Sequence, residues 1–231
     1  MTKHLVLTGA SSGIGRELAV LAEKAGFRLS ICGRNVQKLA TTVEQLDNQA
    51  DTFNQAFCMT DESAVAAFFK GAVQANGPVD VLINCAGLNN VRLPADATPI
   101  EQLDWLMRIN CYAPIECMKA VIPGMKQCGG GTIVNVLSTV CLFSNPGIAA
   151  YTASKAALDA YTKVMRKELA AEHIKLLSVY PGGVDTDFRE ASRPEYLTAK
   201  DVADAVMTML NTGPSAHIHE LVIRPESERN F

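Results

Sequence analysis

The sequence predicts a doubly wound α/β protein, with a parallel sheet of about seven strands and helices on both of its faces. Two observations carry this prediction. Short apolar runs alternate along the chain with longer stretches of helical periodicity, which is typical of a sheet whose strands are buried on both faces. A glycine-rich turn also follows the first apolar run directly and precedes the first helical pattern, as expected at the start of a nucleotide-binding βαβ unit.

The predicted strands are short runs rich in β-branched and other apolar residues. The run VDVLIN at 79–84 is the clearest, and the run near 52–58 is the weakest. In chain order, the seven predicted strands are residues 4–8, 27–32, 52–58, 79–84, 131–138, 174–180 and 219–223. We expect the crossovers between them to be right-handed.

The segments between the strands have helical spacing, most clearly the amphipathic stretch YTASKAALDAYTKVMRKELAAE at 151–172. The predicted helices are residues 13–25, 35–47, 61–76, 99–126, 151–172 and 198–211. The chain has no internal repeat and no low-complexity linker. We therefore interpret residues 1–231 as a single domain.

Composition excludes several classes of protein. The net charge of −3 and the pI near 5.8 argue against a nucleic-acid or anionic-membrane surface. No apolar run approaches the ~20 residues of a membrane span, and the N-terminus does not resemble a signal peptide. Seven scattered cysteines without a C-x-x-C pair favour a reducing cytoplasm. His217 and His219 alternate on a predicted strand, but no carboxylate or cysteine cluster completes a metal site.

The glycine-rich turn TGASSGIG spans residues 8–15 and suits a pyrophosphate. Gly9, Gly13 and Gly15 would let backbone N–H groups and a helix N-terminus approach phosphate oxygens closely. Ser11 and Ser12 would add hydroxyl donors. A purely structural tight turn is the alternative reading of this segment.

The residue after the second strand should choose the cofactor. A carboxylate there would bind the adenosine ribose of NAD, but the sequence has Gly33 and Arg34. A guanidinium suits a 2′-phosphate through charge-assisted hydrogen bonds, so we predict NADP(H). Alternatively, Arg34 is only a solvated surface residue.

Tyr151 and Lys155 stand four residues apart in YTASK and so lie on one helix face. Together with other motifs they resemble the short-chain dehydrogenase/reductase family. The motifs are TGASSGIG at 8–15, NCAG at 84–87, Asn110 in RINCYAP, Ser138 in VLST, YTASK at 151–155 and PGGVDT at 181–186. The resemblance implies a Rossmann-type domain, a homodimer or homotetramer, and oxidoreductase activity on a small-molecule carbonyl or alcohol.

The resemblance also implies a catalytic group of Asn110, Ser138, Tyr151 and Lys155. Tyr151 would donate a proton to the oxygen that receives negative charge. The ordinary pKa of tyrosine is ~10, and bringing it to about 7 requires roughly 4 kcal/mol of phenolate stabilisation. Lys155 would supply part of it and bind the nicotinamide ribose. Ser138 would stabilise the developing charge, and Asn110 would hold a water that relays protons from Lys155.

By the same resemblance, the cofactor-binding residues come from the turns that end the strands. They are Gly9, Ser11, Ser12, Gly13, Ile14, Gly15, Arg34, Met59, Asn84, Ala86, Gly87, Tyr151, Lys155, Pro181, Gly182, Val184 and Thr186. The chain departs from the family pattern at two positions. Cys85 replaces an asparagine, and Cys58 replaces the aspartate that holds the adenine amine, so we expect adenine to rest on apolar contact and the Met59 backbone.

The substrate region is expected after Ser138 and after the sixth strand. An apolar lining is predicted from Val140, Cys141, Leu142, Phe143, Tyr180 and Phe188. Arg189 or Arg193 would attract an anionic substrate, or both are solvated loop charges. A self-association face could use Trp105, Met118, Val121, Ala156, Ala157 and Ala160, which could equally be core residues.

The sequence therefore predicts a cytoplasmic NADP(H)-dependent oxidoreductase that interconverts a carbonyl and a secondary alcohol, with reduction favoured. One alternative is a non-catalytic dinucleotide sensor or scaffold, which should lack one of the four catalytic residues. Another is an epimerase or dehydratase, which would need an additional base near the nicotinamide.

Overall fold

The computed structural model describes residues 2–186, 188, 193–213 and 215–229. Seven parallel strands form one sheet in the order β3-β2-β1-β4-β5-β6-β9. The strands are β1 His4–Thr8, β2 Arg28–Gly33, β3 Phe53–Ala56, β4 Val81–Asn84, β5 Gly131–Val136, β6 Ile174–Pro181 and β9 Glu220–Ile223. The strand order reverses beside β1, so this is a doubly wound Rossmann fold, as the sequence predicts.

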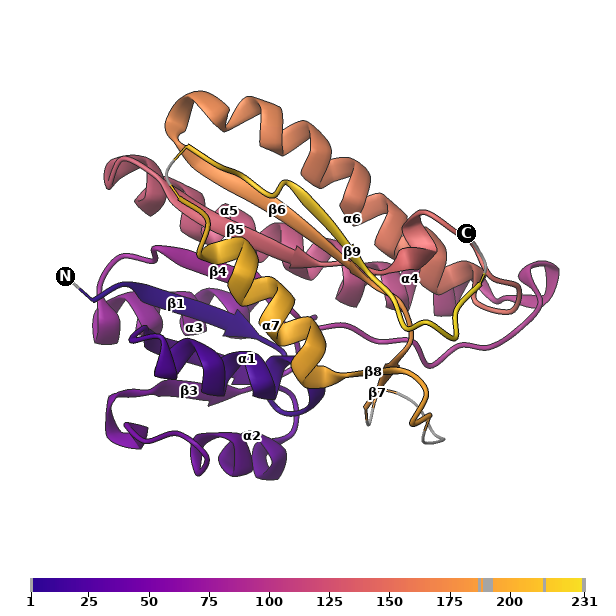
Figure 1. The fold of residues 1–231 in the computed structure, drawn as a ribbon, viewed down its shortest axis with the longest axis horizontal. Coiled ribbons are helices and arrows are strands. Elements are labelled where there is room, and N and C mark those ends of the chain that lie inside the picture. Colours follow the sequence, from indigo (N-terminus) through magenta and orange to yellow (C-terminus); the bar gives the residue numbers. More distant parts are fainter. Residues whose placement is uncertain (1, 187, 189–192, 214, 230–231) are drawn as a thin grey trace.

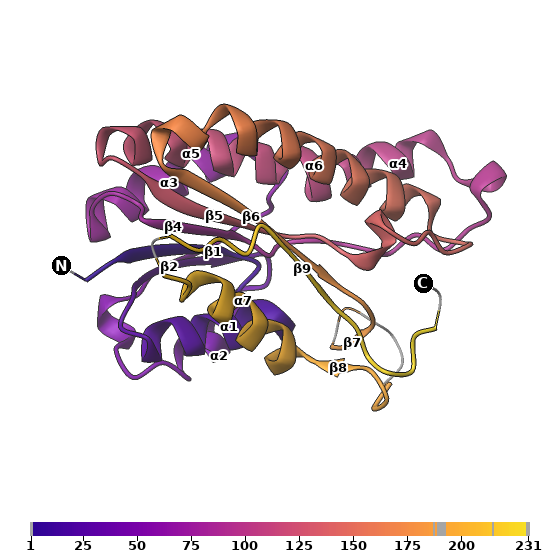
Figure 2. The ribbon, with the colours of Figure 1, turned by 45° about the horizontal axis from the view of Figure 1, so that its top comes forward.

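Helices cover both faces of the sheet (Figure 1; Figure 2). One layer contains α3, α4, α5 and α6, and the other contains α1, α2 and α7. Their bounds are α1 Gly13–Lys24, α2 Val36–Val43, α3 Glu62–Asn76, α4 Ile100–Met107, α5 Ala113–Gln127, α6 Ala149–Glu168 and α7 Ala199–Leu210. The helix predicted at 35–47 is shorter than expected, since α2 ends at Val43 and Glu44 is its C-cap.

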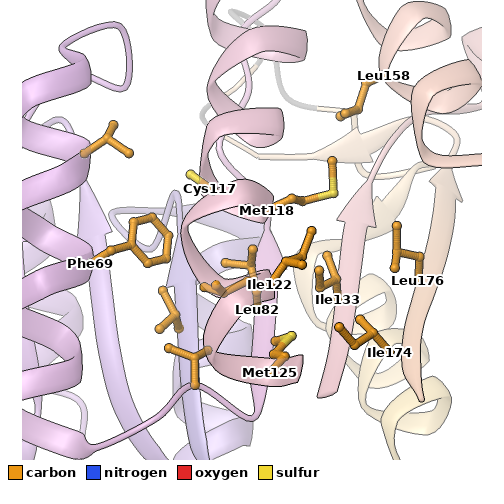
Figure 3. Close-up of a cluster of buried hydrophobic side chains, with 14 of the residues drawn as sticks. Phe69, Leu82, Cys117, Met118, Ile122, Met125, Ile133, Leu158, Ile174 and Leu176 are labelled. Carbon is orange, nitrogen blue, oxygen red and sulfur yellow. The ribbon is translucent and has the colours of Figure 1, made fainter. Parts of the chain in front are cut away.

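The core under α5 shows how the larger layer is held to the sheet (Figure 3). Met118 and Met125 of α5 are fully buried and belong to the same apolar cluster as Leu82 of β4 and Ile133 of β5. Burying a side chain of this size contributes about 1.5–3 kcal/mol. Of the two readings that the sequence left open for Met118 and Val121, the structure supports the core and not the self-association face.

The long helix predicted at 99–126 is divided into three parts. A π-helix, Arg108–Tyr112, separates α4 from α5 and keeps the chain helical throughout. Such π segments leave a local widening of the helix and occur frequently at functional sites. The tertiary structure thus places Asn110 at the centre of an irregularity in the helix.

Two short elements at the carboxyl edge of the sheet were not predicted. β7, Val184–Asp185, pairs in parallel with β8, Leu197–Thr198. They lie beyond the end of β6, next to the start of α7 (Figure 1). This small pair brings the chain after the PGGVDT segment back toward the sheet.

No helix among the described residues is both long enough and apolar enough to cross a membrane.

Candidate active site

The glycine turn between β1 and α1 is built for close backbone contact. Gly9 and Gly13 have φ of 77° and 54°, which side-chain-bearing residues rarely adopt. A methyl group at Gly9 would lie 2.6 Å from the Ala86 nitrogen, and one at Gly15 would lie 2.1 Å from the Gly9 oxygen. The turn therefore requires glycine at these positions and lies directly against the NCAG segment.

Polar groups at this turn fit a phosphate. The Ser11 hydroxyl oxygen is buried and has no hydrogen-bond partner among the described residues. Ser12 precedes α1 with an extended backbone and caps it with no side-chain hydrogen bond. The first N–H groups of a helix, here at Gly13 and Ile14, have no intrahelical acceptor and attract anions. A dinucleotide phosphate would satisfy these donors.

Arg34 lies next to this turn on an exposed segment between Gly33 and the start of α2. A methyl group at Gly33 would lie 1.8 Å from the Ser11 hydroxyl oxygen, so the end of β2 contacts the glycine turn. Sequence reasoning missed Arg16, whose guanidinium donates to the Ser11 carbonyl at 2.8 Å and to Thr42 Oγ1 at 3.1 Å. Its signal was its place in the first turn of α1, directly after Gly15.

The NCAG segment is anchored to β1 and opens toward α6. Thr8 Oγ1 accepts hydrogen bonds from the backbone nitrogens of Cys85 and Ala86, both at 3.2 Å. A methyl group at Gly87 would lie 3.4 Å from both Asn110 Oδ1 and Lys155 Nζ. The structure thus brings two of the predicted catalytic side chains to one glycine at the carboxyl end of β4.

The Asn84 side chain points into the interior rather than toward the glycine turn. Its Nδ2 donates to Asn135 Oδ1 at 2.9 Å and to the Pro114 oxygen at 3.3 Å. Asn135 in turn donates to Thr162 Oγ1 of α6 at 2.9 Å. These bonds link β4, β5 and α6, while the buried Asn84 Oδ1 has no hydrogen-bond partner among the described residues.

Lys155 is buried at the carboxyl end of β5. Its Nζ donates to the Val136 oxygen at 2.8 Å, and its residue is only 4% exposed. Val136 is the last residue of β5, and Ser138 follows two positions later. Tyr151 lies one turn before Lys155 in α6 and is also buried. Lys155 is therefore held directly against the end of β5, two residues before Ser138, and Tyr151 lies one turn away on the same helix.

The sequence predicts that Ser138 ends the fifth strand, but β5 ends at Val136, two residues earlier. It is the N-cap of a 3₁₀ turn, Thr139–Cys141, and its hydroxyl accepts from the Val140 nitrogen at 3.3 Å. The hydroxyl can still donate its proton to another group, because this bond uses only its acceptor capacity.

Asn110 makes three hydrogen bonds from a fully buried position. Its Oδ1 accepts from the Leu88 nitrogen, and its Nδ2 donates to the Leu88 oxygen, both at 2.8 Å. The Nδ2 also donates to Ser154 Oγ at 3.1 Å. The π-helix thus fixes the loop after NCAG to the helix that carries Tyr151 and Lys155.

Desolvation dominates the electrostatics around Lys155. Burial lowers the pKa of its ammonium group. Desolvation raises the pKa of Cys85 to about 12 and that of Cys141 to about 11, although Lys155 opposes both shifts. These thiols stay protonated near neutral pH, so no charged sulfur neutralises the ammonium group.

The lining predicted for the substrate region is only partly exposed. Tyr180 is fully buried and donates its hydroxyl to Asp159 Oδ1 at 2.7 Å, so it does not line the site and that prediction is wrong. Val140 is 6% exposed, and its place in the lining stays a prediction. Leu142 and Phe188 are exposed, and the Phe188 ring lies 6.3 Å from the Tyr151 ring.

Of the two arginines considered for an anionic substrate, Arg189 lies outside the described residues. Arg193 is exposed, and its Nη1 lies 3.8 Å from Glu195 Oε1.

The remaining predicted cofactor residues lie in two segments, one at the end of β6 and one after β3. Thr186 faces the glycine turn, because its Cγ2 lies 3.2 Å from a methyl group placed at Gly13. Pro181 ends β6, Gly182 follows it, and Val184 starts β7. Met59 packs against the apolar cluster that contains Met118 and Met125. The neighbouring Cys58 sulfur lies 3.1 Å from Thr60 Oγ1.

Among the residues that the structure describes, no group of three or more His, Cys, Asp or Glu could hold a metal ion.

The sheet order and the glycine turn at its switch point define a Rossmann-fold protein. Comparison with known proteins adds the family. The protein-family model described as short chain dehydrogenase matches residues 3–197 of this chain. The chain therefore belongs to the short-chain dehydrogenase/reductase family of oxidoreductases.

An uncharacterized oxidoreductase of Staphylococcus epidermidis is 31% identical over 226 residues, covering 96% of this chain and 97% of that protein. A metagenomic short-chain oxidoreductase solved in complex with NADP is 28% identical, with a TM-score of 0.85 over 96% of this chain and 97% of that one. An alcohol dehydrogenase from Thermococcus sibiricus, complexed with 5-hydroxy-NADP, shares the fold with a TM-score of 0.90 at 24% identity, over 99% of both chains.

Proposed function

We propose that this protein is an NADP(H)-dependent oxidoreductase that interconverts a carbonyl and a secondary alcohol, with Tyr151 as the general acid and base. One observation carries the proposal: Asn110 and Lys155 meet at Gly87, on the edge of the sheet that also bears the glycine turn and Ser138. Ligands of open α/β sheets bind at this carboxyl edge.

The cofactor would lie across the glycine turn and supply the hydride. The Gly9–Gly15 turn would hold its pyrophosphate, with Ser11 and the first N–H groups of α1 as donors. Arg34 would bind the 2′-phosphate, and the NADP complex of the 28% identical relative supports this choice. Thr186 and the backbone of Val184 would contact the nicotinamide carboxamide.

The chain's own residues would manage charge and protons. Tyr151 would give its proton to the substrate oxygen, and Ser138 would donate a hydrogen bond to the same oxygen. Lys155 would favour the phenolate of Tyr151 because its ammonium group is desolvated and has no anionic partner nearby among the described residues. Asn110 would maintain the path from Lys155 to solvent.

A panel of aldehydes and ketones, followed at the NADPH absorbance, tests the reaction. Tyr151→Phe should lower kcat by roughly 10²–10⁴-fold, because it removes the proton donor and leaves the ring in place. Tyr161→Phe, on an exposed turn of the same helix, is the matched control and should keep full activity. Activity that survives in Tyr151→Phe would contradict the proposed acid.

The cofactor assignment has its own test. Arg34→Ala should raise KM for NADPH by roughly 10- to 100-fold and leave KM for NADH nearly unchanged, since a lost charge-assisted bond costs about 1.5–3 kcal/mol. Lys70→Ala, on exposed surface of α3, serves as the control. A wild-type preference for NADH would overturn the assignment.

We further propose that residues 1–231 act as one cytoplasmic domain that works as a homodimer or homotetramer. The cysteines are all unpaired, which supports a reducing compartment. Exposed apolar side chains on α6 and the π-helix, Val164 at 57% and Tyr112 at 53%, support a self-association face. Light scattering that gives a clean monomer at micromolar concentrations would reject the oligomer.

A further inference from the structure

The segment after β9 folds back onto the turn that follows β6. Figure 1 shows this tail, in yellow, at the same end of the sheet as β7 and β8. The Gly182 nitrogen donates to the Ile223 oxygen at 2.8 Å, and the Gly183 nitrogen donates to Glu228 Oε1 at 2.7 Å. Both amides of the PGG turn are thus bound by residues more than forty positions later in the chain.

The contact between the tail and the turn leaves no space. A methyl group at Gly182 would lie 2.3 Å from Glu228 Oε2 and 3.1 Å from Pro225 Cδ. On the far side of the turn, a methyl group at Gly183 would lie 2.5 Å from the Tyr196 ring. The turn is therefore enclosed between the tail and the segment leading to β8.

Glu228 also reaches the other side of the site through Arg224. Arg224 Nε donates to Glu228 Oε2 at 3.3 Å, and the two side chains are only 13% and 20% exposed. The Arg224 guanidinium stacks over the Phe143 ring at 5.0 Å, and Phe143 follows the 3₁₀ turn that Ser138 caps. A partly buried pair of this kind is less screened than a surface ion pair.

We propose that Glu228, through its pair with Arg224, is a positioning residue that fixes the Gly182–Gly183 turn relative to the Ser138 segment. This inference rests on the proposed function, in which one of these segments contacts the nicotinamide and the other contacts the substrate oxygen. Neither Glu228 nor Arg224 touches the reacting atoms. Their role is to set the distance between the two segments, and small errors in such distances reduce rates strongly.

The test compares Glu228→Ala with Glu228→Gln and with Glu226→Ala, a control carboxylate exposed on the same tail. Glu228→Ala should lower kcat/KM for the carbonyl substrate by roughly tenfold or more. The Kd for NADPH should change by less than about threefold, because the phosphate contacts lie elsewhere. Glu228→Gln should recover part of the loss, since an amide oxygen still accepts from Gly183. Equal kcat/KM values for Glu228→Ala and Glu226→Ala would overturn the proposal.

A second readout does not depend on catalysis. Hydrogen exchange of the peptide containing Gly182 and Gly183, in the cofactor-free protein, should be at least fivefold faster in Glu228→Ala than in Glu226→Ala. Unchanged exchange would overturn the positioning role even if activity falls. If instead no carbonyl is reduced, or Tyr151→Phe stays active, the proposed function fails, and the exchange comparison alone decides whether Glu228 fixes the turn.

Discussion

At the scale of single residues, Lys155 of the predicted catalytic group is buried at a cost in stability. Its ammonium group is almost fully removed from solvent, and one hydrogen bond, to the Val136 oxygen, is the polar contact that the structure gives it. Desolvation lowers its pKa, and the thiols around it stay protonated. An isolated buried charge is costly, so we interpret Lys155 as a residue retained for chemistry rather than for folding.

Lys155→Met should therefore raise the Tm of the cofactor-free protein at pH 7 while lowering kcat at least a hundredfold. Because the folded pKa of Lys155 is lowered, the unfolded chain binds its proton more readily. The loss of unfolding free energy caused by burying Lys155 is thus fully present below its folded pKa and disappears as pH rises toward ~10.4. In thermal unfolding, the gain in Tm should shrink as pH rises from 7 toward the ordinary lysine pKa of ~10.4.

The exposed Lys70→Met serves as the control and should show no such pH-dependent difference. A lower Tm for Lys155→Met at pH 7 would mean that the bond to Val136 outweighs the desolvation cost.

At the scale of elements, the π-helix is the feature that organises the site. A regular helix through 99–126 would place residue 110 on the continuous helical face, whereas the π turn directs Asn110 toward the loop after β4. Its three hydrogen bonds connect that loop to α6. One irregular turn therefore determines how two elements that carry predicted catalytic residues meet.

Asn110→Ala should destabilise the protein by about 2 kcal/mol, because it leaves the partly buried N–H and C=O of Leu88 without partners. It should also lower kcat measured per folded molecule. Urea unfolding gives the first quantity and steady-state kinetics the second, with Asn90→Ala on the same loop as an exposed control. Reduced stability with unchanged kcat would restrict Asn110 to a structural role.

At the scale of the whole molecule, a buried histidine at the amino edge of the sheet connects two strands to a helix. His4 Nδ1 donates to the Gly77 oxygen at 2.9 Å, which leaves Nε2 to accept from Ser30 Oγ at 2.8 Å. These bonds connect β1, β2 and the end of α3, and Asn76 also donates to Ser30 Oγ at 3.1 Å. The neutral ring is part of the fold's hydrogen-bond network.

Burial lowers the pKa of His4 from its ordinary value of 6.5. The unfolded chain then binds the proton more readily, so stability falls as pH drops below about 6.5 toward the folded pKa. Urea unfolding at pH 7.5 and 5.5 should show a smaller loss in His4→Gln than in the wild type, while the exposed His219→Gln should behave like the wild type. An NMR titration that gives His4 a pKa above 6.5 would contradict this prediction.

The sequence by itself determined the order of the elements and the types of the residues at the site. Periodicity identified all seven strands of the sheet, because strand and helix repeats follow from backbone geometry. The glycine-rich turn could be recognised in the sequence because its backbone leaves no space for a side chain at the glycine positions. The spacing of Tyr151 and Lys155 was equally local, since residues four apart share a helix face.

Only the tertiary structure decided where side chains point across elements. It turned Asn84 toward Asn135, buried Tyr180 against Asp159 and folded Glu228 onto Gly183. The partners in these contacts are separated by between 21 and 51 residues. Local patterns indicate which face of an element is buried, but the residue that this face contacts depends on how the whole chain packs.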